Sequence, residues 1–175
     1  MQKMEQQLGA VCRSMGYDEI ITYSFISPTY YDKIRWAADD ARRESFKILN
    51  PLGEDTSIMR TTVLPSMLEI LTRNYNYRNK TAKLYEIGRI YLGGREDGLA
   101  TESKILSIGA YGADMDFFAM KGQLEAILNG LRLPKASFTA VKDNPSYHPG
   151  RCAEVLVGGS KVGVLGQIHP LVAQN

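Results

Sequence analysis

Residues 50–91 read NPLGEDTSIMRTTVLPSMLEILTRNYNYRNKTAKLYEIGRIY and predict a turn, a helix and a strand in that order. The opening NPLG combines residue types that favour turns. Pro65 stands where the first turn of a helix tolerates proline, and the apolar residues around it recur at helical spacing. The apolar face of this helix comprises Leu64, Met67, Leu68, Leu71 and Tyr75. We expect Leu68 and Leu71 to be buried where the helix covers a sheet.

Residues 83–92 have the alternation of a strand, in which successive side chains point to opposite faces. One face is expected to carry Tyr85, Ile87, Arg89 and Tyr91. The other face is expected to carry Leu84, Glu86, Gly88, Ile90 and Leu92. Glu86 is therefore the charged residue of a face that is otherwise hydrocarbon and glycine.

The first third of the chain predicts a helix followed by a strand. Residues 4–15 place one apolar stripe on a helix, and Gly16 is suited to end that helix. Residues 20–26 are rich in β-branched and aromatic types and predict a strand that Pro28 stops. A short helix is expected at residues 30–36 and a short strand at residues 46–49. The apolar stripe of the first helix comprises Met4, Leu8, Val11, Cys12 and Met15.

The second half of the chain predicts further strands around one helix. A strand is expected at residues 105–111, and Asp116 is a candidate cap for a helix that runs to Leu131. Residues 153–157 and 161–168 alternate around a Gly-Gly-Ser turn, which is typical of a hairpin. The predicted fold class is therefore α+β, with a mainly antiparallel sheet flanked by helices.

The composition fits a folded domain and limits the function classes only weakly. The chain has 175 residues, of which 44% are hydrophobic, so it falls within the range of one domain with its own core. Its formal net charge of +2 neither requires nor excludes a nucleic-acid partner. Without an apolar segment of membrane-spanning length or a signal-peptide pattern, we expect a cytoplasmic protein with no membrane partner.

Cysteine and histidine usage favours structural roles over a metal site. Cys12 and Cys152 lie far apart and form no CxxC pair, which favours buried or incidental thiols over a disulfide or a metal site. His148 and His169 each precede proline, and no ligand-spaced cluster surrounds them. The sequence therefore predicts no metal-binding residues.

Residues 73–80 read RNYNYRNK and interleave basic and aromatic residues, as proteins that bind single-stranded nucleic acid do. A helix end followed by a solvated polar loop is the favoured interpretation, because Tyr75 continues the apolar face of the helix. Nucleic-acid binding by this segment is the less favoured alternative.

Several segments in one order resemble the beta subunit of bacterial phenylalanyl-tRNA synthetase, in its class II synthetase-like core. The centre of the resemblance is LYEIGRIY at residues 84–91, after the turn and helix described above. Further segments of the family are matched at residues 16–25, 116–131, 147–151 and 163–170. The resemblance covers nearly the whole chain and implies a single core domain over residues 1–175, as a fragment of a longer beta subunit.

The resemblance also implies that this domain is not catalytic. In catalytic class II synthetases, a strand similar to residues 83–91 continues into an arginine that grips the α-phosphate of ATP, and then into an acidic residue. Leu92 and Gly94 stand at those two positions, and Tyr23 stands near the position of a signature proline. The face that these positions share carries Glu86 and should repel ATP. We therefore predict no catalytic and no cofactor-binding residues, with ATP and magnesium serving only the whole enzyme.

The implied role is to hold a catalytic alpha subunit, in an assembly of two alpha and two beta chains that attaches phenylalanine to tRNA. In class II synthetases the segment that resembles residues 4–25 builds the subunit interface. The resemblance thus assigns the interface to Leu8, Val11, Met15, Tyr17 and Tyr23. The alternative for this stripe is packing on the chain's own sheet. The full assembly also implies tRNA as a partner.

Two other functions stay open from the sequence. A free-standing ATP-dependent ligase of synthetase-like fold is disfavoured by the missing arginine. A direct tRNA-binding module is disfavoured by the mild net charge.

Overall fold

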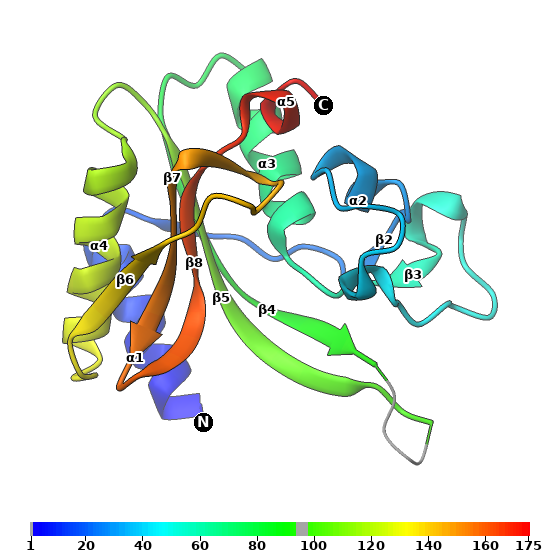
Figure 1. The fold of residues 1–175 in the computed structure, drawn as a ribbon, viewed down its shortest axis with the longest axis horizontal. Helices are drawn as coiled ribbons and strands as arrows, with labels where there is room; N and C mark the ends of the chain where they lie inside the picture. The colour runs from blue at the N-terminus through cyan, green and yellow to red at the C-terminus, as the bar shows by residue number, and fades with distance from the viewer. Residues whose placement is uncertain (1, 94–97) are drawn as a thin grey trace. The chain divides into compact units, whose positions relative to one another are not determined.

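The computed structural model describes residues 2–93 and 98–175 and divides the chain into two compact units (Figure 1). The first unit comprises Met1–Asp18 and Tyr111–Asn175, and the second comprises Glu19–Ala110. Within the described residues, no helix has the length and apolar character needed to cross a membrane.

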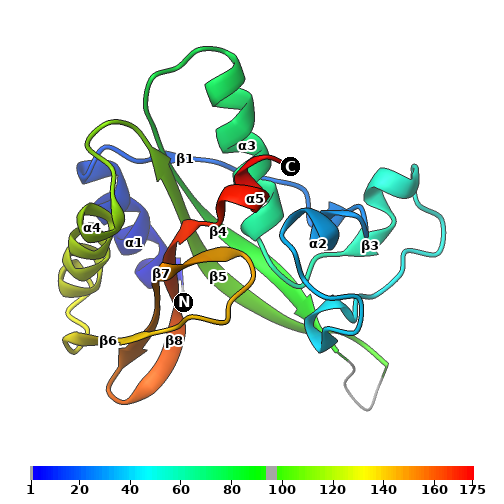
Figure 2. The ribbon, with the colours of Figure 1, turned by 45° about the horizontal axis from the view of Figure 1, so that its top comes forward.

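The first unit packs two helices with a three-stranded antiparallel sheet. Figures 1 and 2 show helix α1 (Gln2–Ser14) beside helix α4 (Phe117–Gly130). The sheet has the order β6-β7-β8 and is followed by the short helix α5 (Pro170–Ala173). Its strands are β6 (Ala136–Ala140), β7 (Tyr147–Val157) and β8 (Ser160–Ile168).

Local chemistry explains where α4 begins and how it packs. The carboxylate of Asp116 caps the helix by accepting a hydrogen bond of 2.7 Å from the Ala119 backbone N–H, as predicted. One face of the helix then packs on a sheet core formed by Ala136, Val155 and Leu165. The helix residues in that contact are Phe117, Met120, Leu124 and Leu128.

The predicted hairpin between β7 and β8 is confirmed. Gly158 and Gly159 connect the strands with φ angles of 58° and 83°, and Val157 pairs with Ser160. Two successive residues with positive φ fit a tight hairpin turn, and glycine adopts this conformation without a steric cost.

The second unit contains helix α3 (Leu64–Asn76) and the sheet β1-β4-β5. The strands are β1 (Asp18–Glu19), β4 (Ala82–Leu92) and β5 (Thr101–Tyr111). Pro65 lies in the first turn of α3, as predicted. The helix approaches β5 closely, because a Cβ added to Gly109 would lie 2.7 Å from Leu71 Cδ1 and 2.8 Å from Met67 Cγ. Figure 2 shows α3 lying along β4 and β5.

A smaller substructure of the second unit is built around Tyr31 and Trp36. Strand β2 (Phe25–Ile26) pairs antiparallel with β3 (Ile58–Met59), and a single bridge joins Lys47 to Ile58. Helix α2 (Tyr30–Lys33) brings the Tyr31 ring to a stacked position 5.2 Å from the Trp36 ring. Two short 3-10 helices, Ala41–Arg43 and Glu54–Thr56, complete the unit.

Three helices end at an arginine in the left-handed region of backbone space. Arg35, Arg78 and Arg132 have φ angles of 64°, 63° and 58°. After α3, the Arg78 N–H donates to the Tyr75 carbonyl at 2.8 Å, and the Asn79 N–H donates to the Asn74 carbonyl at 3.2 Å. These two bonds form a Schellman turn, whose left-handed residue is usually glycine. The arginines place cations at helix carbonyl ends, where the helix dipole favours positive charge.

The predicted strand at residues 20–26 is wrong over most of its length. Regular strand in this segment is confined to Asp18–Glu19 and Phe25–Ile26, although the Ile20 N–H still donates to the Tyr85 carbonyl of β4 at 2.9 Å. Between them, the Thr22 backbone N–H donates to the Glu86 carboxylate at 3.2 Å instead of to a neighbouring strand. A side chain therefore replaces the ladder bond that a strand would need.

The apolar face of α3 ends earlier than predicted. Met67 is 2% exposed, whereas Leu68 and Leu71 are half-buried and Tyr75 is 68% exposed. The expected burial of Leu68 and Leu71 is thus only partial, and the interpretation of Tyr75 as part of the packed face is wrong. The buried part of this face thus ends before Tyr75.

Candidate functional site

The strand face that would carry a nucleotide in a catalytic synthetase lies on β4. Glu86 and Ile90 are 3% and 6% exposed, and Gly88 between them is buried too. Leu92, at the position of the missing arginine, is 40% exposed. Gly94, at the position of the missing acidic residue, lies outside the described residues. The chemistry of this face therefore depends on Glu86, on Gly88 and on the side chain that covers them.

Arg60 covers the face. Its side chain is 1% exposed, and its Nη2 lies 3.0 Å from Oε1 of Glu86. Arg60 Nη1 donates to the Thr22 hydroxyl at 2.6 Å, and its Nε donates to the Arg89 carbonyl at 2.8 Å. The expectation that Glu86 presents an unbalanced negative charge is wrong, because a buried guanidinium neutralises it at hydrogen-bond distance.

Thr22 completes this buried network. Its hydroxyl lies 2.8 Å from Oε2 of Glu86, within donating distance, while its backbone N–H donates to Oε1. We call Arg60, Glu86 and Thr22 the Arg60 network. In the described part of the chain, every buried side-chain nitrogen and oxygen has a hydrogen-bond partner. The network is thus a satisfied polar core that joins three distant segments.

Gly88 shows how closely the network fills the face. A Cβ at this position would lie 2.7 Å from Arg60 Nη2 and 3.1 Å from Val63 Cγ2. A phosphate placed against this part of β4 would have to displace a guanidinium held by three partners. The Arg60 network thus provides packing and charge balance within the protein. The Arg60 nitrogens bond to protein groups and not to a ligand.

Next to the network runs a segment with large apolar side chains turned outward. Ile21, Tyr23 and Phe25 are 91%, 82% and 44% exposed. We call these three residues the exposed strip. The residues between them are anchored inward, because Thr22 bonds to Glu86 and the Ser24 carbonyl accepts a 2.9 Å bond from the Arg60 N–H. The Arg60 network therefore fixes which side chains of this segment face solvent.

The five predicted interface residues differ in how far their side chains are exposed. Tyr23 belongs to the exposed strip of the second unit, whereas Leu8, Val11, Met15 and Tyr17 belong to the first. Leu8, Val11 and Met15 are half-buried. A Cβ added to Gly130 would lie 3.0 Å from Val11 Cγ2, so α1 and α4 touch at this point. Part of the predicted stripe is therefore used in packing within the unit.

Tyr17 is an internal residue of the first unit. It is 2% exposed, and its hydroxyl donates to the Gln123 side chain and lies 3.7 Å from the Met120 sulfur. Burial, with a smaller contribution from Cys12, raises the pKa of Tyr17 to about 12. Its phenol is thus neutral near pH 7 and helps to fix α4 to the segment that follows α1.

The two histidines have local backbone partners. His148 Nδ1 accepts a bond from the Gly150 N–H, and His169 Nδ1 accepts one from the Leu171 N–H, which caps α5. Cys12 and Cys152 are buried free thiols. Among the residues that the structure describes, no group of three or more His, Cys, Asp or Glu side chains is arranged to hold a metal ion.

Sequence reasoning missed the Arg60 network. The local signal was a single basic residue inside the run SIMRTTVLP, which is otherwise uncharged. A lone arginine in such a run indicates a buried, paired side chain, because an unpaired buried charge is strongly disfavoured. Its partner could not be read from the sequence, since Glu86 lies 26 positions away.

Comparison with known proteins points to one family. The family model described as "Phenylalanyl tRNA synthetase beta chain CLM domain" matches residues 1–175. The phenylalanine–tRNA ligase beta subunit of Clostridium acetobutylicum is 40% identical over 176 aligned positions, covering 100% of this chain and 22% of that protein. The Clostridium tetani beta subunit is 39% identical, covering 99% of this chain and 22% of that protein. The chain therefore spans about a fifth of the length of these curated relatives.

Solved structures support the fold assignment. A pyrrolysyl-tRNA synthetase structure, Desulfitobacterium hafniense PylSc, superposes with a TM-score of 0.76 at 13% identity, covering 99% of this chain and 60% of that one. A second pyrrolysyl-tRNA synthetase structure from the same organism gives a TM-score of 0.72, also at 13% identity, covering 92% of this chain and 56% of that one. At such low identity the likeness concerns the fold alone. The predicted α+β, class II synthetase-like fold is confirmed.

Proposed function

The chain belongs to the phenylalanyl-tRNA synthetase beta chain CLM domain family, and from that premise we propose that it is a noncatalytic core module of a beta subunit. In this role it holds and orients the catalytic alpha subunit, which attaches phenylalanine to its tRNA during translation. The assembly contains two alpha and two beta chains and works in the cytoplasm. ATP and magnesium serve the whole enzyme, and tRNA is bound by the full assembly.

One observation carries the noncatalytic part of this proposal. The strand face that would meet ATP is occupied by Arg60, whose three guanidinium nitrogens bond to Glu86, Thr22 and the Arg89 carbonyl. A synthetase site needs donors aimed at phosphate oxygens as charge develops on them. Here Arg60, which covers this face of β4, donates to groups inside the protein. Leu92, at the end of the strand, has no side-chain donor.

The scaffolding part rests on the exposed strip. Ile21 and Tyr23 are 91% and 82% exposed although they are large and mostly apolar. Their neighbours Thr22 and Ser24 are tied to the Arg60 network, so the strip is held in one orientation before a partner arrives. A pre-ordered aromatic and aliphatic strip is the kind of anchor that protein interfaces use. We therefore assign the centre of the alpha-subunit interface to the exposed strip.

Variants of the strip test this interface. The double change Ile21→Ser with Tyr23→Ser should weaken binding of the catalytic alpha subunit about 100-fold, since two anchor side chains are lost. Binding would be measured by titrating alpha subunit onto the immobilised chain. The melting temperature should stay close to that of the parent, because both side chains are exposed.

A matched control removes similar apolar area elsewhere. Val162 on β8 and Leu171 on α5 are 58% and 49% exposed, and their replacement by serine should leave the affinity unchanged. Equal affinity of the strip variant and the parent would place the interface elsewhere.

A further inference from the structure

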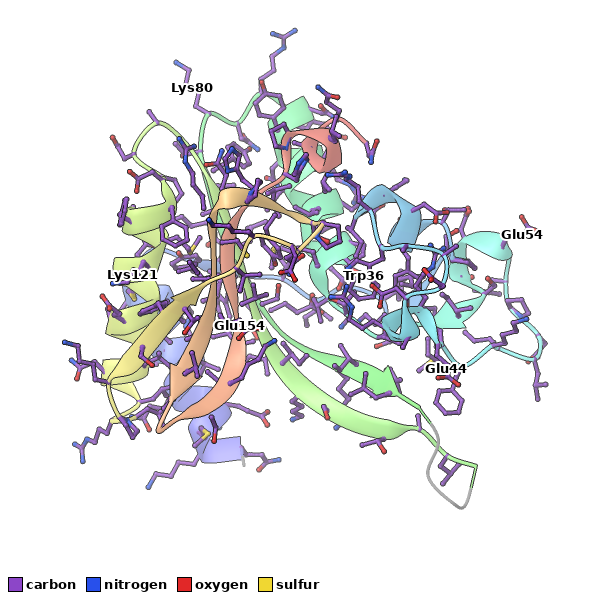
Figure 3. The ribbon with its side chains drawn as sticks, viewed as in Figure 1. Trp36, Glu44, Glu54, Lys80, Lys121 and Glu154 are labelled. Atoms are coloured by element: carbon purple, nitrogen blue, oxygen red, sulfur yellow. The ribbon has the colours of Figure 1, made fainter. Side chains whose placement is uncertain are left out.

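The loop that precedes β3 exposes two leucines completely. Leu49 and Leu52 are each 101% exposed, so neither side chain loses surface to packing within the chain. We call these two residues the tip leucines. In Figures 1 and 3 the loop extends beyond β3, and the side chain of Glu54, which follows the loop, points away from the ribbon. An isolated surface leucine needs no explanation, so the meaning of the tip leucines depends on what adjoins them.

The loop that carries the tip leucines is held by hydrogen bonds at both ends. At its base, the Ile48 N–H donates to the Ser57 carbonyl at 2.9 Å. On its far side, the Thr56 N–H donates to the Gly53 carbonyl at 3.1 Å. Pro51 lies between the two leucines and restricts the backbone there. A partner that binds the tip leucines therefore meets a loop that is already ordered, which lowers the entropic cost of binding.

The small sheet beside this loop carries a row of three apolar side chains. Phe25 of β2 pairs with Met59 of β3. On the other side of β3, the bridge between Lys47 and Ile58 and the 2.9 Å bond from the Met59 N–H to the Phe46 carbonyl place Phe46 beside Met59. Residues opposite each other in an antiparallel pair have their side chains on the same face. Phe25, Met59 and Phe46 therefore form one row across the three segments, which we call the apolar row.

The apolar row lies on the outer face of the small sheet. Phe25 is 44% exposed, and Met59 and Phe46 are half-buried. The paired residues Ile26 and Ile58, which point to the opposite face, are only 3% and 6% exposed. Phe25 is also the last residue of the exposed strip, so the exposed strip and the apolar row form one continuous apolar surface within the second unit.

We propose that the catalytic alpha subunit covers the apolar row and that the tip leucines insert into an apolar groove of its surface. The inference rests on the proposed function and extends the interface beyond the exposed strip. A partner that covers the exposed strip as far as Phe25 comes next to Met59, which is the cross-strand neighbour of Phe25. The tip leucines adjoin the same surface, because the 3-10 helix Glu54–Thr56 that follows their loop contacts β2. Their side chains offer hydrocarbon alone, which an apolar groove complements.

A dye attached to the loop tests the contact. Leu52→Cys in the whole 175-residue chain adds an exposed thiol, whereas Cys12 and Cys152 are 0% and 4% exposed and should stay unlabelled. Acrylodan on the new thiol should shift its emission to shorter wavelength as alpha subunit is added, because the dye enters an apolar site. The same dye on Val162→Cys is the matched control and should not shift, since Val162 is 58% exposed on β8, outside the apolar surface.

Affinity gives a second readout. The double change Leu49→Ser with Leu52→Ser should weaken binding of the alpha subunit about 100-fold, because burial of each leucine contributes about a factor of ten or more. Binding would be measured by titrating alpha subunit onto the immobilised chain. The melting temperature should match that of the parent, since the tip leucines are fully exposed.

The outcomes separate this contact from the proposed function. If the parent binds the alpha subunit, unchanged affinity of the tip variant, or unchanged emission of the dye at position 52, would overturn the contact and leave the proposed function standing. No binding by the parent would overturn both. Light scattering on the chain alone gives the remaining outcome: a dimer that becomes monomeric after the double leucine change would assign the tip leucines to a second copy and would overturn the inference.

Discussion

Arg60→Met is expected to destabilise the chain by about 3–5 kcal/mol, because the substitution leaves the buried carboxylate of Glu86 without its cation. Arg60 and Glu86 side chains are 1% and 4% exposed, so water cannot replace the lost partner without opening the core. The midpoint of urea unfolding, followed by circular dichroism, gives the change in the free energy of unfolding.

Two further variants test whether the loss of stability comes from breaking the buried ion pair or from replacing an arginine in general. Combining Arg60→Met with Glu86→Leu should recover most of the lost stability, since both charges are then absent. Arg89→Met removes an arginine from the same strand region, but its side chain is 50% exposed and pairs with the half-exposed Glu102. That change should alter the free energy of unfolding by less than about 1 kcal/mol. Equal unfolding midpoints for Arg60→Met and the parent would contradict the assigned network.

Met67→Ala is expected to cost about 2–5 kcal/mol, because it leaves a cavity where α3 meets β5. Met67 is 2% exposed, and its side chain lies against the backbone of Gly109. Leu68→Ala should cost less, since Leu68 is only half-buried, and Thr72→Ala should have little effect because Thr72 is exposed. Thermal unfolding of the three variants should therefore rank Met67→Ala as the least stable.

A different ranking would change the orientation assigned to α3. If Leu68→Ala melted below Met67→Ala, the helix would present its Leu68 side to the sheet. If Thr72→Ala were also strongly destabilised, the packed face would differ from the one described for this helix.

Features with a local cause could be predicted from the sequence. Gly16 was expected to end the first helix, and it has a φ of 81° after α1. Pro65 at the start of α3, the Asp116 cap and the Gly158-Gly159 turn were also found where they were expected. Each depends on the backbone preference or hydrogen-bonding reach of one or two residues, which is independent of the rest of the fold.

Features that depend on distant contacts could not be predicted. Thr22 and Glu86 are 64 positions apart, so nothing local indicated that a side chain would take the backbone bond of the predicted strand. The exposure of Tyr75 depends on how α3 packs in the folded chain, which helical periodicity alone does not indicate. Tyr17 was assigned to an interface by resemblance, and its burial follows from contacts with α4 more than 100 positions away.

If this module holds a catalytic alpha subunit, the two proteins form a complex in solution. Light scattering on a chromatographed equimolar mixture of the chain and the catalytic alpha subunit tests it most directly. We expect one species that is heavier than the alpha subunit alone by 19.5 kDa for each chain bound. Two separate species, each with the mass that it has alone, would contradict the scaffolding role.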